Sequence, residues 1–501
     1  MSQVYRSTRS DKHEELSFED VVMTGLAPDG GLYLPSEIPK LPSNFLETWK
    51  NLSFNELAFN ILRLYIKESE IPNEDLKDLI ERSYSTFRSD EVTPLQKIND
   101  QIYLLELFHG PTYAFKDVAL QFVGNLFEYF LTRRNASKKN GERDIITVVG
   151  ATSGDTGSAA IYGLRGKKDV SVFILYPTGR ISPIQEEQMT TVEDENVHTL
   201  SVNGTFDDCQ DIVKMIFGDK EFNDKYHVGA VNSINWARIL AQQTYYFYSY
   251  FQLQKIIGDN NKIRFVVPSG NFGDILAGYY AYKMGLPVDK LIIATNENDI
   301  LDRFMKTGEY AKQQEIGVKA TYSPAMDILI SSNFERLLWY LIRDNVTDHN
   351  DEKAGALLND WMKQLKENGK FTAPNEVVDS ARSIFDSDRV DNTETIKTIK
   401  EIYTENKYIL DPHTAVGVKT TLRFIEKDQE PKHYISLSTA HPAKFSEVVN
   451  KALDTFENYS FEKDVLPDEL KALSTKEKRL KFIDEPSVSK VKQAIKDELK
   501  F

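Results

Sequence analysis

Short runs rich in valine and isoleucine alternate with longer helical stretches along most of this chain. The runs lie at residues 145–149, 170–176, 197–202, 263–267, 291–295 and 434–437. A continuous apolar run that leads through a turn into a helix is typical of a strand buried in a parallel sheet. The repeated order therefore predicts an α/β fold, with helices packed on parallel strands and right-handed crossovers.

This pattern divides the chain into three parts. Residues 1–95 have helical periods and a turn cluster but no such runs, so we expect a separate, mostly helical N-terminal domain. Residues 96–460 are expected to form two α/β lobes, the smaller over about 117–255, with a charged helical insertion at about 340–405. We expect a helical tail over residues 461–501.

The charge balance argues against several classes of partner. The chain has 61 Lys and Arg against 76 Asp and Glu, a net charge of −15. Nucleic acids and anionic membranes are bound through basic surfaces, so neither is expected as a partner. A small anionic substrate remains compatible with this charge, because its site needs only a few local donors.

Cysteine usage and the N-terminus indicate where the protein works. The single cysteine, Cys209, rules out a disulfide within the chain, a CxxC zinc site and a dithiol redox motif. No metal site is predicted. No stretch approaches the ~18 consecutive apolar residues of a membrane span, and the N-terminus lacks the apolar region of a secretory signal. We therefore expect a cytoplasmic protein.

Two glycine-rich turns follow predicted strands, where an open parallel sheet binds its ligands. The first contains Thr152, Ser153, Gly154, Asp155 and Thr156. Its hydroxyls and backbone N–H groups can present donors to an anion at a helix N-terminus. It lacks the Gly-Lys-Ser/Thr of a Walker A loop and is not GxGxxG. A tight turn whose Asp or Thr only caps the helix has the same composition.

The second turn follows the run at residues 263–267 and has similar chemistry. Its glycines allow a close approach of the backbone to a phosphate, and the helix that follows adds a positive dipole end. We interpret it as a candidate phosphate site, formed by Gly270, Asn271, Phe272, Gly273 and Asp274.

Lys116 and Thr439 are two further candidates. Lys116 lies among Pro, Tyr, Ala and Phe residues in HGPTYAFKD, and desolvation there would lower the pKa of its amine and make it a usable base. A lysine whose charged end reaches solvent is the alternative. Thr439 follows the run at residues 434–437, in a turn that a purely structural role also explains. We interpret His109 and His413 as structural residues.

Four segments together carry a family resemblance that none carries alone. They are HGPTYAFKD (109–117), ATSGDTGSAA (151–160), NSINWARILAQ (232–242) and PSGNFGD (268–274). With GLAPDGGLYL at residues 25–34, they resemble pyridoxal-phosphate enzymes of fold type II, related to tryptophan synthase β. More narrowly, they resemble the threonine synthase family, in the longer form found in fungi and many bacteria. The resemblance covers nearly the whole chain and implies a two-lobed parallel-sheet body.

The resemblance also implies roles for individual residues. Lys116 matches the lysine that holds pyridoxal 5′-phosphate as a Schiff base, and Thr439 matches the residue that faces the pyridine nitrogen. The segment from Gly270 to Asp274 matches the loop around the cofactor phosphate. The segment from Thr152 to Thr156 matches the loop that holds the substrate carboxylate. Asn235 and Arg238 are candidates for the substrate phosphate, and Ser153, Thr156 and Arg180 are weaker ones. The group that contacts the cofactor's 3′ oxygen stays open.

The implied activity is that of a carbon–oxygen lyase acting on phosphates, which converts O-phospho-L-homoserine and water to L-threonine and phosphate. One alternative is a phospholyase on the same scaffold, which eliminates phosphate and gives a 2-oxo acid. Another is a non-catalytic scaffold homologue, which the intact Lys116 and phosphate loop disfavour. Whether the protein is a monomer or a homodimer stays open.

Overall fold

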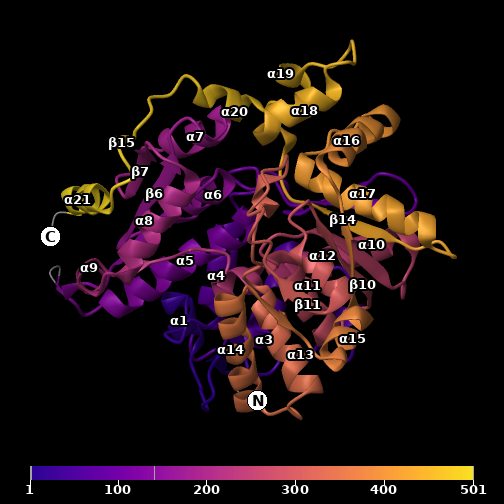
Figure 1. Cartoon of the computed structure of the whole chain (residues 1–501), viewed down its shortest axis with the longest axis horizontal. Coiled ribbons are helices and arrows are strands. Elements are labelled where there is room, and N and C mark those ends of the chain that lie inside the picture. The colour runs from indigo at the N-terminus through magenta and orange to yellow at the C-terminus, as the bar shows by residue number, and fades with distance from the viewer. Residues whose placement is uncertain (1–2, 140–141, 500–501) are drawn as a thin grey trace.

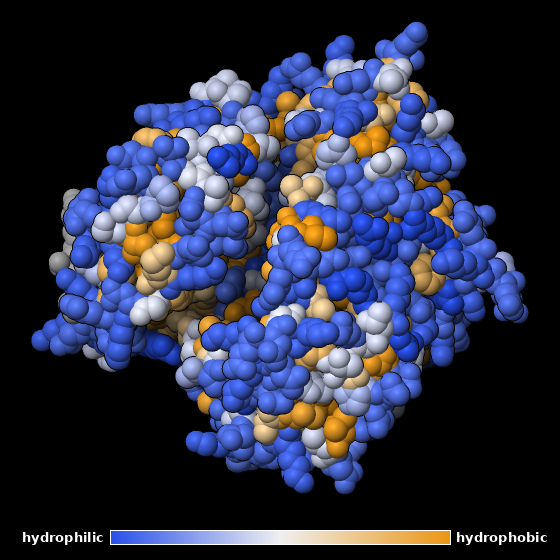
Figure 2. Space-filling model, in the orientation of Figure 1, coloured by the Kyte–Doolittle hydropathy of each residue, from blue (hydrophilic) through white to orange (hydrophobic). Residues whose placement is uncertain are grey.

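Two α/β lobes face each other across a groove, with the N-terminal region packed beneath them (Figure 1). The structure, a computed structural model, describes residues 3–139 and 142–499. Figure 2 shows the groove as a deep hollow between the two halves of the molecule. Among the described residues, no helix is both long enough and apolar enough to cross a membrane.

The larger lobe is built on a six-stranded sheet of order β13-β10-β9-β14-β4-β3. All neighbouring strands are parallel except β3 and β4. The strands are β3 (Leu95–Lys97), β4 (Ile102–Glu106), β9 (Ile263–Pro268), β10 (Val288–Thr295), β13 (Phe385–Arg389) and β14 (Tyr434–Ser438). The helices that pack around this sheet are α11 (Gly273–Met284), α12 (Ile300–Thr307), α16 (Asn392–Asn406), α17 (Pro412–Lys427) and α18 (Ser446–Leu453).

The smaller lobe has a five-stranded, fully parallel sheet of order β15-β7-β6-β5-β8. Its strands are β5 (Ile146–Ala151), β6 (Val170–Pro177), β7 (Val197–Val202), β8 (Val228–Gly229) and β15 (Lys481–Ile483). Its helices are α6 (Asp155–Leu164), α7 (Pro183–Thr190), α8 (Phe206–Gly218), α9 (Lys220–Tyr226) and α21 (Val488–Glu498). The apolar runs of the sequence thus form the buried strands of two sheets, as expected for parallel strands covered on both faces.

Two long helices connect these parts. Helix α5 (Lys116–Asn135) packs on α6, and α10 (Trp236–Ile257) packs on α5, α11 and α3. The aromatic residues of α10 are buried on all sides, which explains why their pattern covers several helix faces. Helix α10 therefore lies between the lobes and does not belong to the smaller one alone.

The N-terminal region pairs β1 (Tyr5–Ser7) with β2 (Tyr33–Pro35) and adds four helices. These are α1 (Phe18–Thr24), α2 (Phe45–Thr48), α3 (Phe54–Tyr65) and α4 (Asn73–Tyr84). A capping box between Ser53 and Glu56 starts α3. The buried face of α3 belongs to the main hydrophobic core, which extends without interruption into the two α/β lobes.

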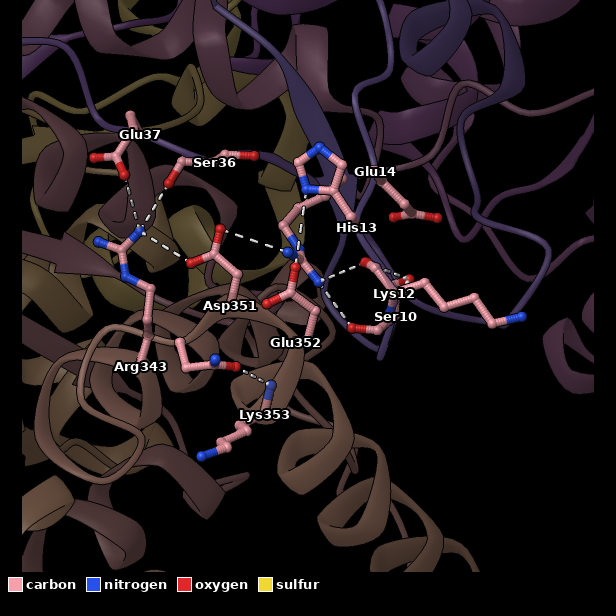
Figure 3. Close-up of polar contacts among 12 residues, drawn as sticks. Ser10, Lys12, His13, Glu14, Ser36, Glu37, Arg343, Asp351, Glu352 and Lys353 are labelled. Carbon is pink, nitrogen blue, oxygen red and sulfur yellow. Dashed lines mark hydrogen bonds and ion pairs between the residues drawn. The ribbon is translucent and has the colours of Figure 1, made fainter.

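The predicted helical insertion packs against this N-terminal region. It contains α13 (Phe334–Asn345), α14 (Asp351–Asn368) and α15 (Asn375–Ile384), and β12 (Lys370–Thr372) pairs with β11 (Glu309–Ala311). Figure 3 shows Arg343 of α13 reaching the carbonyl oxygen of Ser36 at 2.7 Å and the carboxylates of Glu37 and Asp351 at 3.9 and 3.8 Å. The contacts with Ser36 and Glu37 join segments about 300 residues apart.

Three strands lie where the sequence predicts helices, β12 and β13 in the insertion and β15 in the tail. Strand β13 falls inside the predicted insertion, and its sequence FDSDR lacks an apolar run because it is an edge strand with half-buried residues. The predicted helical tail does hold α19 (Phe461–Asp464), α20 (Asp468–Leu473) and α21, but it also holds β15. This strand has only three residues and pairs with β7, Lys481 opposite Leu200. It is too short to give a periodic signal.

Candidate active site

A cavity of about 960 Å³ opens into the groove between the lobes. The turns that follow β5, β9 and β14 line it, as the rule for open parallel sheets predicts. The start of α5, two turns of α10, the first turns of α8 and the segment from Pro324 to Ile330 form further parts of its walls.

Lys116 is the first residue of α5, and its side chain lies in this cavity. The amine makes no hydrogen bond or ion pair with the described residues. Burial lowers the pKa of Lys116 to about 8, since an ammonium loses hydration in the protein interior. The Asp155 carboxylate opposes this shift, while the charges of Arg238 and Lys444 add to it. Lys116 can therefore exchange a proton near neutral pH.

The loop before Lys116 is held by its own hydrogen bonds. The backbone N–H and the hydroxyl of Thr112 donate to the Asp117 carboxylate at 2.8 and 2.7 Å. Tyr113 has φ +62°, an uncommon conformation for a non-glycine residue, and the Arg88 guanidinium lies 3.8 Å from the centre of its ring. The backbone N–H of Phe115 donates to the carbonyl oxygen of Thr439, in the loop that follows β14. These contacts fix where α5 begins and so where Lys116 lies.

The turn from β5 to α6 is organised by Thr152. Its hydroxyl accepts hydrogen bonds from the N–H groups of Gly154 and Gly157, at 3.0 and 2.9 Å, so it stabilises the turn itself. Gly154 has φ +150°, which favours glycine. The turn places Asp155 at the positive end of α6 and leaves Ser153 and Thr156 lining the cavity.

Asp155 lies between two lysines. Its Oδ1 is 2.6 Å from the Nζ of Lys444 and accepts a hydrogen bond from the Gln185 amide at 3.1 Å. Burial alone would raise the pKa of Asp155, but the ammonium groups of Lys444 and Lys116 outweigh it and hold the pKa well below its usual range. The cavity therefore contains a permanent carboxylate beside Lys116.

The turn from β9 to α11 forms a cradle of backbone donors. A Cβ on Gly270 would lie 3.0 Å from the carbonyl oxygen of Ala325 and from the Cα of Met326, so glycine allows this close approach. Phe272, with φ +68°, turns the chain into α11. The first N–H groups of a helix have no acceptor within it, and those from Gly270 to Gly273 find none elsewhere among the described residues. They are available to an anion.

Asp274 follows this cradle on α11. Its Oδ1 accepts hydrogen bonds from the hydroxyls of Tyr245 and Tyr246, while Oδ2 is buried without a partner among the described residues. Burial raises the pKa of Asp274 to about 7, against the two tyrosine hydrogen bonds, which lower it. Asp274 is thus close to half-protonated at neutral pH.

Arg238 is a buried cation that lines the cavity. It is 3% exposed, and its Nη1 donates to the carbonyl oxygen of Val231 at 3.2 Å. Its Nε has no partner, and no carboxylate of the described residues lies within ion-pairing distance. Burial lowers the pKa of Arg238 to about 10, which leaves the guanidinium charged at neutral pH. A buried charge without a counter-ion is costly, so this site favours an anionic ligand.

Two further residues line the cavity: Thr439, which follows β14, and His413, in the first turn of α17. The hydroxyl of Thr439 makes no hydrogen bond with the described residues, and its carbonyl oxygen accepts from Phe115 at 2.8 Å. His413 donates from Nδ1 to Asp411 at 2.8 Å and accepts at Nε2 from the N–H of Ala325 at 3.1 Å. Both nitrogens of His413 are therefore used to fix the cavity wall.

Known proteins resemble this chain over almost its whole length. Residues 4–84 match the family described as Threonine synthase N terminus, residues 87–435 match Pyridoxal-phosphate dependent enzyme, and residues 414–495 match Threonine synthase, C-terminal. The threonine synthase of Saccharomyces cerevisiae is 66% identical over 99% of this chain and 98% of its own length. The chain belongs to the threonine synthase family.

Solved structures of the threonine synthase family superpose on this fold. A crystal structure of threonine synthase from yeast has a TM-score of 0.97 at 66% identity, and covers 99% of each chain. A structure of threonine synthase from Brucella melitensis with bound pyridoxal phosphate has a TM-score of 0.89 at 40% identity, and covers both chains fully. The expected fold type II body is thereby confirmed.

The cavity fits the pyridoxal phosphate on which this family depends. Among the described residues, it offers an amine at Lys116 whose pKa is lowered to about 8, N–H groups around Gly270 without a protein acceptor for a phosphate, and a Thr439 hydroxyl without a protein partner. Across residues 3–139 and 142–499, no group of three or more His, Cys, Asp and Glu side chains is placed to hold a metal ion.

Most residues that the sequence singles out lie together in this cavity. Those that line it are Lys116, Thr152, Ser153, Asp155, Thr156, Arg238, Gly270, Asn271, Phe272, Gly273, Asp274 and Thr439. Gly154 shapes the turn without lining the cavity. Asn235 is not brought to the site: its amide donates to Val22 and accepts from Ala237, both at 3.0 Å, and so caps α10.

The polar residues near the site that were not predicted include Gln185, Gln242 and Lys444. Gln185 and Gln242 line the cavity, and Lys444 lies behind Asp155. Gln242 belongs to NSINWARILAQ and lies one turn after Arg238, so helical spacing carried a signal for it. Gln185 and Lys444 contact Asp155 only through the tertiary fold, and no local pattern marks them.

Proposed function

We propose that this protein converts O-phospho-L-homoserine and water to L-threonine and phosphate, with pyridoxal 5′-phosphate held at Lys116. Membership of the threonine synthase family supports this function. The observation that carries the residue assignment is Lys116 itself, an unpaired amine with a pKa of about 8 in the interlobe cavity.

Pyridoxal phosphate, when bound, withdraws electrons from the Cα of an attached amino acid. Around it we assign the cofactor phosphate to the N–H groups from Gly270 to Gly273 and the pyridine nitrogen to the Thr439 hydroxyl. Asp274 closes the phosphate loop by accepting from Tyr245 and Tyr246. These residues bind and orient, and none has to move a proton.

Proton transfer falls to Lys116. A base works best when its pKa lies near the working pH, and the Lys116 amine meets this condition. It can take a proton from the substrate Cα and return it there later. Asp155 stays ionised beside it and does not compete as a proton donor.

Substrate binding needs two anion sites in addition to the site that holds the cofactor phosphate. For the substrate carboxylate we propose Ser153 and Thr156, next to the N-terminus of α6. For the substrate phosphate we propose Arg238, because its buried charge has no carboxylate partner among the described residues. Asn235 has both amide atoms engaged and is not included.

The function is tested by spectroscopy and product analysis. The purified protein with added cofactor is expected to absorb at about 410–420 nm, as a lysine Schiff base does, and Lys116→Ala is expected to lose this band. With O-phospho-L-homoserine, threonine and phosphate should appear one to one. Phosphate with 2-oxobutanoate would show a phospholyase. Absence of both the band and turnover would indicate a non-catalytic homologue.

Two further expectations belong to the same proposal. The acidic composition and the single, buried Cys209 support a cytoplasmic location, where thiols stay reduced. The substrate is a small molecule, and neither nucleic acid nor membrane is proposed as a partner.

A further inference from the structure

Lys444 is a buried lysine that the proposed chemistry does not use. It is 1% exposed and lies in the 3-10 turn Pro442–Phe445, which follows β14. Its Nζ lies 2.6 Å from Oδ1 of Asp155 and donates to the carbonyl oxygen of Thr112 at 2.8 Å. An ammonium group removed from water this completely needs strong partners, and these two provide them.

These contacts join three loops at the cavity. Thr112 belongs to the loop after β4, Asp155 to the turn after β5, and Lys444 to the turn after β14. Strands β4 and β14 are neighbours in the larger sheet, while β5 is in the smaller sheet. The Lys444–Asp155 ion pair therefore crosses from one lobe to the other, directly beside the cavity.

The Lys444–Asp155 pair also affects the balance of charges around the Lys116 amine. Four charged groups act on the Lys116 amine: Asp155 on α6 and Asp117 on α5 favour its charged form, while Arg238 on α10 and Lys444 oppose it. Lys116 is not within ion-pairing distance of Asp155. The carboxylate is instead engaged by Lys444, and Gln185 donates to the same oxygen.

We propose that Lys444 is a positioning residue whose ammonium engages the Asp155 carboxylate across the two lobes, so that this carboxylate does not pair with Lys116. Lys444 does not line the cavity; it acts by engaging Asp155, and its charge also opposes the charged form of Lys116. The inference rests on the proposed function, because Lys116 must be an uncharged amine to condense with the cofactor's aldehyde and release water.

The test measures the uncharged amine in cofactor-free, full-length protein. A small acylating reagent modifies only the neutral form of lysine, and mass spectrometry of the Lys116 peptide gives the rate across about pH 6 to 10. In Lys444→Met, the midpoint of this pH profile is expected to rise by about one unit or more, because Asp155 is free to pair with Lys116. Lys444→Arg keeps the charge and should leave the midpoint in place.

Two variants of Asp155 separate this role from a general structural one. Asp155→Asn should shift the midpoint downward, the opposite direction, since it removes the attractive charge and leaves Lys444. The double variant Asp155→Asn/Lys444→Met should return the midpoint close to that of the unaltered protein. Lys451→Met, which changes an exposed lysine of α18, is the matched control and should have no effect.

The outcomes are decisive even where one variant is unstable. An unchanged midpoint in Lys444→Met, or a double variant that shifts as far as Lys444→Met alone, would overturn the proposal. If Lys444→Met does not fold, the same pH profile in Lys444→Gln decides: an upward shift of the midpoint supports the proposal, and no shift overturns it. The proposed function is judged separately, by the absorbance band and products of the unaltered protein, and its failure leaves the profile measurable.

Discussion

The guanidinium of Arg238 donates to the carbonyl oxygen of Val231 at 3.2 Å, and this is its one hydrogen bond within the part of the chain that the structure describes. A neutral oxygen does not balance a buried positive charge. An anion in the cavity would do so, which is why we assign the substrate phosphate to this residue.

Removing the Arg238 guanidinium should weaken substrate binding. We expect Arg238→Ala to raise the KM for O-phospho-L-homoserine more than about tenfold, equal to about 1.4 kcal/mol, in steady-state kinetics. Arg180→Ala is the matched control, because Arg180 is exposed and does not line the cavity, and its KM should change less than about twofold. Equal KM values for both variants would remove Arg238 from the phosphate site.

Filling the close approach at Gly270 should weaken cofactor binding. The added Cβ of Gly270→Ala would press on the backbone of Ala325 and Met326, and backbone cannot move aside as a side chain can. We expect the Kd for pyridoxal phosphate, measured by absorbance titration, to rise about tenfold or more. Gly218→Ala adds the same methyl group where no atom lies within 4 Å, and should bind the cofactor normally.

Asp274 should make the stability of the cofactor-free protein fall as the pH rises. Its pKa is raised to about 7 in the folded protein from 3.8, so between these values the folded protein holds a proton that the unfolded chain has lost. Stability is full below about pH 4 and falls until about pH 7, by on the order of 4 kcal/mol.

Urea unfolding at several pH values checks this dependence. Asp274→Asn can still accept from Tyr245 and Tyr246 but does not titrate, so its unfolding midpoint should fall less between about pH 5 and 7.5 than that of the unaltered protein. Asp259→Asn alters an exposed carboxylate and serves as the control. Parallel curves for all three proteins would contradict the expectation.

Asn235 should contribute to stability and not to binding. Losing this cap in Asn235→Ala should lower the free energy of unfolding by about 1–2 kcal/mol and leave the KM within about twofold. Asn350→Ala removes the cap of α14, far from the cavity, and should behave in the same way. A KM that rises tenfold only in Asn235→Ala would return Asn235 to the site.

The fold was predictable wherever a strand is buried on both faces. Strands such as β6 and β9 read as apolar runs because both faces are covered. Strand β13 lies at a sheet edge, and pairing with β10, Leu291 opposite Phe385, gives it its conformation. Apart from the buried Phe385, its residues are half-buried and polar, so neither periodicity nor propensity marks a strand there.

The site was predictable where a turn has to approach a ligand. Gly270 lies in a glycine-rich turn that lets the backbone approach a phosphate. Lys116 lies among apolar residues that remove water from its amine. Lys444 could not be found in this way, because it meets Thr112 across 332 positions of sequence, and its burial depends on both lobes. Asn235 shows the reverse case, in which a residue within a family motif serves the helix that carries the motif.

The outer strand of the smaller sheet has a consequence for biosynthesis. Strand β7 pairs with β15, which is translated roughly 280 residues later, or ~15–60 s at usual elongation rates. During that interval β7 is an open sheet edge on a nascent chain, and open edges recruit other strands. The smaller lobe therefore completes its sheet only near the end of translation, and until then the edge of β7 is a site where the emerging chain can pair with other strands.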